Sequence, residues 1–300
     1  MIINLCGGSG GGSSAPIKLQ GLIARENGTY TPDEGYDGYS EVLVEVTEPT
    51  EVFVVPDGIK FSNSTFTEIP DYLDFSECSD LSYVFSSCDN LNNINLVNIK
   101  ATNMSHLFSN NTSLTNIISL NTSNATDIGN CFATCSSLVT IPLLDTHNVI
   151  KMDYLFTQSK KLQSIPQLVT TNLEDASYMF YYCEKLESVP LLDFGSVRNA
   201  NRIFGYCNSL TELGGLQNFK PSVSYGFFEN APNLTVDSLM NVINNLYDWS
   251  GNTNGYASLN NGKRVYFSTS HYLKFGQTNL DKLTPEQIAV ATAKGWTLTA

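Results

Sequence analysis

The chain has 300 residues, of which 42% are hydrophobic, and a net charge of −13 at pH 7 from 29 acidic and 16 basic side chains. The hydrophobic fraction is that of a folded chain, and no apolar run approaches the roughly 18 residues that span a bilayer. The excess of acidic side chains opposes binding to nucleic acid or anionic lipid, because both need a basic surface. We therefore expect no nucleic-acid or membrane partner.

The first 16 residues combine an apolar tip with a flexible tether. Residues 7–14 read GGSGGGSS, which is typical of a flexible linker. A short apolar peptide on a tether suits docking to another protein by strand addition, although a frayed terminus is an equal alternative. No basic residue precedes Cys6, which argues against a cleaved signal peptide there. The predicted attachment residues are Met1, Ile2, Ile3 and Leu5.

Residues 17–56 are predicted to form a small β module. Turn signals stand at the Asn-Gly, Pro-Asp and Asp-Gly pairs that begin at positions 27, 32 and 37. Valines at 42, 44 and 46 alternate with Leu43 and Glu45, as in a strand. A module of this size has little core of its own, so we expect it to lean on the rest of the chain, on copies of itself or on a partner.

A phenylalanine then recurs every 24 residues, after one interval of 23, and a leucine follows each one six positions later. The phenylalanines are Phe85, Phe108, Phe132, Phe156, Phe180, Phe204 and Phe228. A small residue stands three positions after each phenylalanine and, in six of the units, a branched aliphatic nine positions after it. A fixed period of this length predicts a solenoid of about seven turns over residues 57–236, stacked at about 4.8 Å.

Each unit is predicted to have two halves. Apolar residues at i, i+3 and i+4 favour one or two turns of helix in the first half. In one unit these are Met152, Leu155 and Phe156. The second half is too short for a helix and reaches a proline in three units, which favours a short strand. Ile69 and Pro70 mark a degenerate first turn.

Residues 237–300 are predicted to form an α/β cap. A first helix follows Asp237, its expected N-cap, and carries one apolar face. Residues 264–275 alternate like a strand pair. A second helix is expected between Thr284 as N-cap and Gly295, with Pro285 at its first position and Gln287 closing a capping box. Trp296 and Leu298 are expected to begin a final strand.

No sequence motif for catalysis or metal binding is present. The three histidines lie in no motif, and we find no nucleophile elbow, phosphate loop or zinc signature. Four of the seven cysteines share one repeat position with Asn, Ser and Ala, which favours packed, reduced thiols over disulfides. Asp145 and Asp193 are predicted to form turns through their side chains, and the alternative is that they bind calcium ions in a row along the coils. We predict no enzyme activity, cofactor or metal.

Four tyrosines are the best candidates for ligand binding. They crowd two adjacent units, near Lys160, Lys161 and Lys185. Tyrosines beside cations suit recognition of a sugar or a protein, although these rings could simply cover the outer face of the coil. The candidates are Tyr178, Tyr181, Tyr182 and Tyr206.

The repeat LFxxxxxLxxIPxLDT resembles BspA-like bacterial surface leucine-rich repeats, best over residues 131–156 and in register over about residues 59–236. The resemblance implies a leucine-rich-repeat solenoid in an α+β chain, and members of that family are mostly displayed on cell surfaces, where they bind host proteins or other cells. Residues 26–46 resemble a module of tail, baseplate and fibre proteins of gut bacteriophages. Residues 234–249 and 278–298 resemble the C-terminal cap of phage-encoded repeat proteins.

These resemblances lead to the expectation of a virion structural protein, made in the host cytoplasm, that forms an exposed head or tail fibre or appendage. Its N-terminus would join other virion proteins of the capsid or tail, as a homo-oligomer, and its repeats would adhere to glycans or proteins of the host cell or mucus. The alternative is a bacterial surface leucine-rich-repeat adhesin. A third possibility, an enzyme such as a depolymerase, would need paired carboxylates about 5–9.5 Å apart in a groove.

Overall fold

The structure of the chain is a computed structural model. It describes in full residues 54–55, 57–71, 73–221, 224–250 and 271–300. It describes the backbone alone of residues 17–20, 28–30, 42–45, 53, 257–260 and 263–266. Among the described residues, no helix is long and apolar enough to cross a bilayer.

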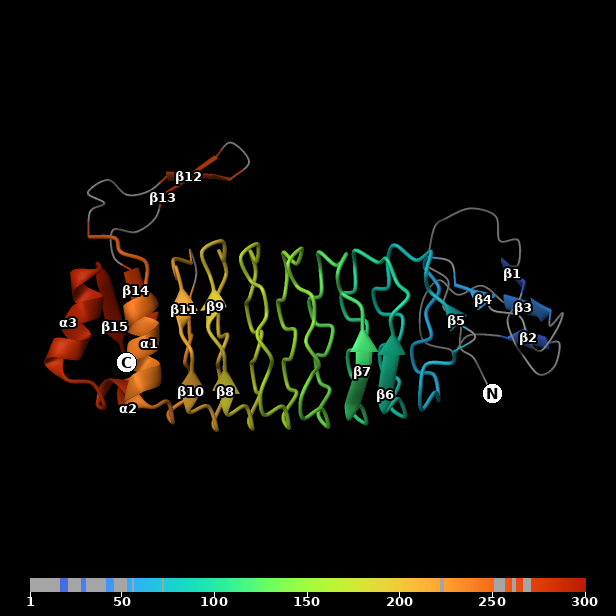
Figure 1. The fold of residues 1–300 in the computed structure, drawn as a ribbon, viewed down its shortest axis with the longest axis horizontal. Coiled ribbons are helices and arrows are strands. Elements are labelled where there is room, and N and C mark those ends of the chain that lie inside the picture. Colours follow the sequence, from blue (N-terminus) through green and yellow to red (C-terminus); the bar gives the residue numbers. More distant parts are fainter. Residues whose placement is uncertain are drawn as a thin grey trace.

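Figure 1 labels the helices and strands of the described residues. The helices are α1 (Val236–Asn245), α2 (Gln277–Leu280) and α3 (Pro285–Ala293). The strands before the middle of the chain are β1 (Ile17–Gln20), β2 (Gly28–Tyr30), β3 (Val42–Glu45), β4 (Phe53–Val54), β5 (Leu73–Asp74), β6 (Asn93–Leu96) and β7 (Asn116–Leu120). The later strands are β8 (Ser188–Val189), β9 (Leu192–Asp193), β10 (Glu212–Leu213), β11 (Leu216–Gln217), β12 (Ala257–Asn260), β13 (Lys263–Tyr266), β14 (His271–Lys274) and β15 (Trp296–Thr299).

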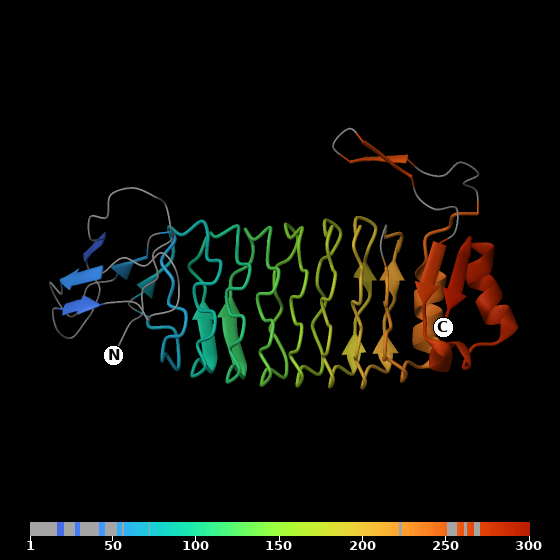
Figure 2. The ribbon, with the colours of Figure 1, turned by 180° about the vertical axis from the view of Figure 1, so that it is seen from behind.

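The middle of the chain forms a row of coils that lie side by side, with β1, β2 and β3 at one end and α1, α3 and β15 at the other (Figures 1 and 2). Parallel pairs join segments one repeat apart, namely β6 with β7, β8 with β10 and β9 with β11. Isolated parallel bridges continue the pattern, for instance between Lys151 and Asp175. Because the coils bond to their neighbours in the row, each coil is stabilised mainly by the two beside it.

The single 23-residue interval of the repeat is accommodated in the β6–β7 pair. The register shifts between Ile94 and Asn95, so that Asn95 pairs with Ser119 instead of the next residue along β7. The skipped residue, Ile118, is 61% exposed. One missing residue therefore changes the local register and leaves the coils before and after it aligned.

Three of the four described strands of the predicted N-terminal module form one small sheet, and the fourth, β4, pairs with β5. β3 pairs in parallel with β1 and antiparallel with β2. β3 covers Val42–Glu45, where the alternating sequence predicts a strand, and that prediction is confirmed. The predicted attachment residues Met1, Ile2, Ile3 and Leu5 and the glycine-rich linker lie outside the described residues.

The repeated phenylalanines form a buried stack along the inside of the row. Neighbouring rings from Phe85 to Phe228 lie nearly parallel, with centroids 5.6–5.9 Å apart, a favourable offset distance. Phe61 adds one further ring, 5.6 Å from Phe85. The sequence pattern missed Phe61 because Thr67, six positions later, replaces the expected leucine.

The small residue three positions after each phenylalanine is mostly a hydrogen-bond donor. Its side chain donates to the backbone carbonyl of the phenylalanine one coil earlier, for instance from Cys183 Sγ to Phe156 O at 3.1 Å and from Ser159 Oγ to Phe132 O at 2.8 Å. The other donors of the row are Cys88, Asn111, Cys135 and Cys207. All six described cysteines are free and buried, so the prediction of packed, reduced thiols is confirmed for them.

Substituting Cys183 tests whether this position needs a donor as well as a small side chain. Burial raises the pKa of the Cys183 thiol well above its usual value, so the group stays protonated and can donate. We expect Cys183→Ala to cost about 1 kcal/mol more than Cys183→Ser, since serine keeps the bond to Phe156 O, as Ser159 does in the neighbouring coil. Urea unfolding of both variants measures this difference, and equal losses would show that only size matters.

The first half of each coil is a run of tight turns, and the predicted helix is wrong. In the coil of Phe156, the N–H of Leu155 donates to the carbonyl of Met152, three residues earlier. The N–H of Phe156 donates across to Met179 in the next coil. Left-handed backbone, which an α-helix excludes, occurs twice in this coil. Those two residues are Tyr154 and Gln158, with φ of 56° and 60°. The apolar spacing thus reflects consecutive turns that direct side chains into the core.

The N-cap of α1 is Thr235, and the prediction of Asp237 is wrong. Thr235 Oγ1 accepts the N–H of Ser238 at 3.2 Å, which satisfies one free donor of the first turn. Asp237 lies inside that first turn, where its negative charge still favours the helix N-terminus. The predicted apolar face is buried against the last coil. Its residues are Leu239, Val242, Ile243 and Leu246.

The second cap helix, α3, begins as predicted. Thr284 accepts the N–H of Gln287, whose side chain accepts the N–H of Thr284, and Pro285 is the first helical residue. Gly295 follows with a φ of 82°. The predicted pairing within residues 264–275 is wrong, because β13 pairs with β12 and β14 pairs in parallel with β15. A parallel pair needs a long crossover, and α3 supplies it.

Candidate ligand-binding surface

The candidate tyrosines come from three repeat positions close to the buried phenylalanine. Tyr178 lies two positions before Phe180, and Tyr182 and Tyr206 lie two positions after theirs, all with left-handed backbone. Left-handed backbone occurs at these two positions in coil after coil. Side chains at equal positions of adjacent coils therefore lie at strand spacing, about 4.8 Å, which is close enough for rings to stack.

The structure brings the four predicted tyrosines into one cluster. Tyr182 stacks on Tyr206 with ring centroids 4.2 Å apart and planes 8° apart. Tyr181 stands edge-on to the other three rings, 5.1 Å from Tyr178, 4.7 Å from Tyr182 and 5.5 Å from Tyr206. All four side chains are half-buried. We call these four residues, together with Tyr154, the tyrosine cluster.

Tyr154 was not among the candidates, although the repeat points to it. It occupies the position of Tyr178 one coil earlier, and the two rings stack with centroids 4.6 Å apart. The same position one coil later is Arg202, whose guanidinium lies 5.3 Å from the ring centre of Tyr225. A comparison of the residues at this one repeat position would have found Tyr154 and Arg202. Residues at the same position of successive repeats become neighbours in the fold.

Gly205 allows the Tyr181 ring to lie close to the next coil. A Cβ atom at Gly205 would lie 2.8 Å from Cδ2 of Tyr181, closer than two carbon atoms pack. Gly205 follows Phe204 directly, so it is the counterpart of Tyr181 in its own coil. A larger residue there would push the ring away, and the edge-on contacts of Tyr181 would be lost.

The tyrosine cluster is electrically neutral although the chain is acidic. Arg202 Nε forms an ion pair with Glu229 Oε2 at 2.8 Å. The adjacent Tyr182 raises the pKa of Tyr206 above its usual value, with smaller contributions from burial and Glu229. The Tyr206 phenol is therefore protonated at neutral pH, so its hydroxyl can donate and accept hydrogen bonds. Lys160, expected near the cluster, pairs with Glu184 of the next coil at 3.0 Å.

A hollow lies where the last coil meets α2, and we call it the cap hollow. Its volume is about 380 Å³. Pro232 contributes partly exposed apolar surface beside the buried rings of Phe228 and Phe275. Asn208, Asn230 and Gln277 contribute amide groups. Asn230 occupies the same repeat position as Tyr206 and lies beside it, where it opposes the rise in the Tyr206 pKa. The hollow therefore adjoins the tyrosine cluster.

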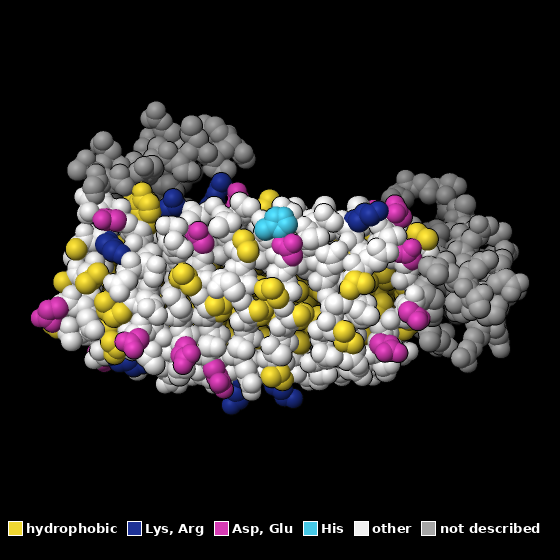
Figure 3. All heavy atoms as spheres, in the orientation of Figure 1, with side chains coloured by type: hydrophobic (Ala, Val, Ile, Leu, Met, Phe, Trp, Pro, Cys, Tyr) yellow, Lys and Arg dark blue, Asp and Glu magenta, His cyan; other side chains and the backbone are white. Residues whose placement is uncertain are grey.

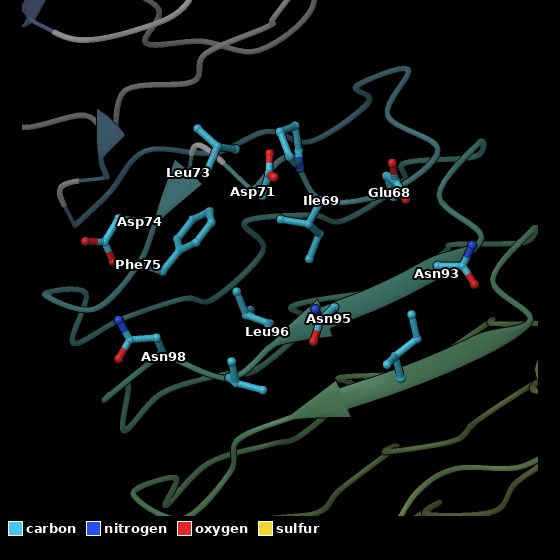
Figure 4. Close-up of a pocket in the computed structure, with 13 residues that line it drawn as sticks. Glu68, Ile69, Asp71, Leu73, Asp74, Phe75, Asn93, Asn95, Leu96 and Asn98 are labelled. Carbon is cyan, nitrogen blue, oxygen red and sulfur yellow. The ribbon is translucent and has the colours of Figure 1, made fainter. Parts of the chain in front are cut away.

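A second hollow, the acidic hollow, lies at the other end of the row beside β5 and β6 and has a volume of about 390 Å³. Figure 4 shows the side chains of Glu68, Asp71 and Asp74 and several asparagines around an apolar surface that includes Phe75 and Leu96. No described group of three His, Cys, Asp or Glu side chains could hold a metal ion.

The three histidines are engaged in packing or turns. His106 stacks on Tyr83 with centroids 4.2 Å apart, and His271 stacks on Trp249 at 4.3 Å. His147 Nδ1 contacts Asp145 Oδ1 on the surface. Burial lowers the pKa of His106 and of His271. Asp145 and Asp193 form side-chain turns by accepting backbone N–H groups two residues on, as predicted.

Elsewhere the surface exposes single aliphatic side chains of successive coils. Leu143 is 72% exposed and Val97 is 56% exposed. Figure 3 shows hydrophobic side chains in a band along one face of the row, with acidic side chains toward its margins. Among the described surface residues, the tyrosine cluster groups five aromatic rings in mutual contact. It is therefore the strongest candidate for a recognition surface.

The observations so far define a protein of stacked, 24-residue coils that carries a half-buried aromatic cluster and no recognised catalytic sequence motif. The sequence profile of the family described as "Mycoplasma protein of unknown function, DUF285" matches residues 60–140 and 102–219. These matches together cover more than half of the chain, so the chain belongs to this family. The match agrees with the resemblance to BspA-like repeat proteins. Among curated proteins, none matches the chain.

Proposed function

We propose that the chain is a non-catalytic adhesion component of a bacteriophage particle, with its coils forming a leucine-rich-repeat solenoid that displays the tyrosine cluster. The observation that carries the adhesive role is the cluster itself, in which half-buried phenols of three adjacent coils contact one another. Aromatic groups of this kind dominate recognition surfaces, because they bury a large area at a small entropic cost. The proposed ligands are glycans or proteins of the host cell or mucus.

The phage setting is supported by the two flanks and by the start of the chain. Residues 26–46 and the cap resemble parts of phage proteins, and the apolar tip on a glycine-rich tether suits docking to capsid or tail proteins. Free, buried cysteines suit assembly in a host cytoplasm. We propose that the N-terminus attaches a homo-oligomer to the virion and that the repeats project from it.

A bacterial surface adhesin is the alternative function, and the family favours it in one respect. The description of the matching family names Mycoplasma, which is a cellular organism. The same tyrosine cluster would then face a partner from the surface of the cell that makes the protein. The two functions differ in where the protein is displayed and share the recognition surface.

Immunogold electron microscopy distinguishes them. With an antibody against residues 61–300, we expect label at a regular place on purified phage particles, which would also separate head from tail. Deleting residues 1–16 should remove that label while the repeats remain folded, as judged by circular dichroism. Bare particles with label on bacterial cells would overturn the phage proposal and support the surface adhesin.

Adhesion itself is tested with purified protein on host cells and on mucin-coated surfaces. We expect the double variant Tyr182→Ala and Tyr206→Ala to lose at least about tenfold in binding, since both rings of one stacked pair are removed. Tyr83→Ala is the matched control, because Tyr83 stacks on His106 away from the cluster. Equal binding by all three proteins would show that the cluster is not the adhesive surface.

A further inference from the structure

We infer that the cap hollow is a binding site for the end of an uncharged oligosaccharide whose next sugars lie along Tyr206 and Tyr182. The inference rests on the proposed adhesive function. It adds the class of ligand and the place where the end of the ligand binds. Three observations carry it, namely the size of the hollow, its amide groups and its continuity with the tyrosine cluster.

The size and lining of the hollow suit a small amphipathic ligand. Pockets for small ligands occupy about 300–1,000 Å³ and combine apolar walls with a few polar groups, and the cap hollow has about 380 Å³. Phe228 and Phe275, which meet edge to face at 5.5 Å, are buried beside it, and Pro232 contributes partly exposed apolar surface. A sugar ring has C–H groups on its faces that can pack on such a surface, and hydroxyls at its edges that need hydrogen bonds.

The polar groups of the hollow are amides, which can pair with those hydroxyls. Among the described residues, the side-chain amide of Asn208 has no hydrogen-bond partner. Gln277 uses its Nε2 to donate to Asp281 and keeps its carbonyl oxygen for another donor. Amides both donate and accept, as sugar hydroxyls do. No Lys, Arg, Asp or Glu is among the residues that line the hollow. The adjacent Lys282 and Asp281 are already engaged, with Pro232 O and with Gln277 Nε2, so the lining itself suits an uncharged ligand.

The hollow continues into the tyrosine cluster along one repeat position. Tyr182, Tyr206 and Asn230 occupy that position in three successive coils, and the two rings stack at 4.2 Å. The phenol hydroxyls of Tyr182 and Tyr206 are therefore one coil apart. Asn230, the next residue of this row, lines the hollow. An extended chain of sugars can therefore bind with its end in the hollow and its following residues across the phenols.

The proposal is tested by isothermal titration calorimetry of the full chain with cellotetraose, maltotetraose and chitotetraose, with sialyllactose as an anionic probe. We expect at least one neutral probe to bind and sialyllactose to bind at least tenfold more weakly. Asn208→Trp fills the hollow and should weaken the neutral probe at least tenfold. Thr112→Trp is the matched control, since Thr112 is exposed at the same repeat position four coils earlier.

The outcomes separate this inference from the proposed function. Weaker binding by Asn208→Trp alone supports the hollow. Equal binding by both variants overturns it and leaves the tyrosine cluster as the whole site. Binding to cells or mucin without binding to any neutral probe overturns the sugar ligand and leaves adhesion to a protein. Absence of binding to cells, mucin and every probe overturns the adhesive function together with the inference.

Discussion

Phe156→Ala should destabilise the chain by about 3–5 kcal/mol, the largest loss among the substitutions considered. Phe156 is fully buried in the middle of the stack, 5.8 Å from both Phe132 and Phe180. Truncation removes two ring contacts and leaves a cavity that the hydrogen-bonded coils on either side cannot close. Urea unfolding followed by circular dichroism measures the loss.

Leu143→Ala is the control, because Leu143 is 72% exposed and its truncation should change stability by less than about 0.5 kcal/mol. Because coils depend on their neighbours, the loss at Phe156 should also broaden the transition or divide it into two steps. A loss below about 1 kcal/mol with an unchanged transition would contradict the buried stack.

Gly214→Ala should cost about 3 kcal/mol, although it adds only one methyl group. A Cβ atom at Gly214 would lie 2.4 Å from the backbone nitrogen of Leu191 and 2.8 Å from the carbonyl carbon of Pro190. Both are backbone atoms of the preceding coil, so no side-chain rotation relieves the clash. The last coil must then move away from its neighbour, which breaks the contacts that join β10 and β11 to β8 and β9.

Ser188→Ala serves as the control for Gly214→Ala. Ser188 lies in β8, which pairs with β10, and its truncation adds no atom between the coils, so a change below about 0.5 kcal/mol is expected. Thermal unfolding of both variants shows the difference. Hydrogen exchange should localise the loss in Gly214→Ala to the last coil and α1, and protection unchanged there would contradict the close approach at this glycine.

The helix prediction in the first half of each coil failed for a physical reason. Met152, Leu155 and Phe156 have helical spacing, yet their segment folds as consecutive turns. An isolated segment would satisfy its N–H groups within itself, whereas here alternate N–H groups donate to the next coil. Spacing alone cannot reveal that partner, because it is supplied by a coil about 24 residues away.

The candidate site was found from sequence only in part. The tyrosine content of residues 178–206 indicated the cluster, and reading one repeat position would have added Tyr154. The cap hollow could not be foreseen, because Phe228 and Phe275 belong to segments whose contact depends on how the cap folds back. The edge-on position of Tyr181 likewise depends on the small size of Gly205 in the neighbouring coil.

The sequence by itself determined the period, the buried phenylalanines and the caps of α3, because these depend on local spacing and on backbone chemistry within a few residues. The tertiary structure decided the rest. It placed Cys183 as a donor to a carbonyl of the preceding coil, it paired β14 with β15, and it joined the tyrosines to a hollow. Each of these depends on a contact between distant segments, whose geometry is set only when the coils and the cap pack together.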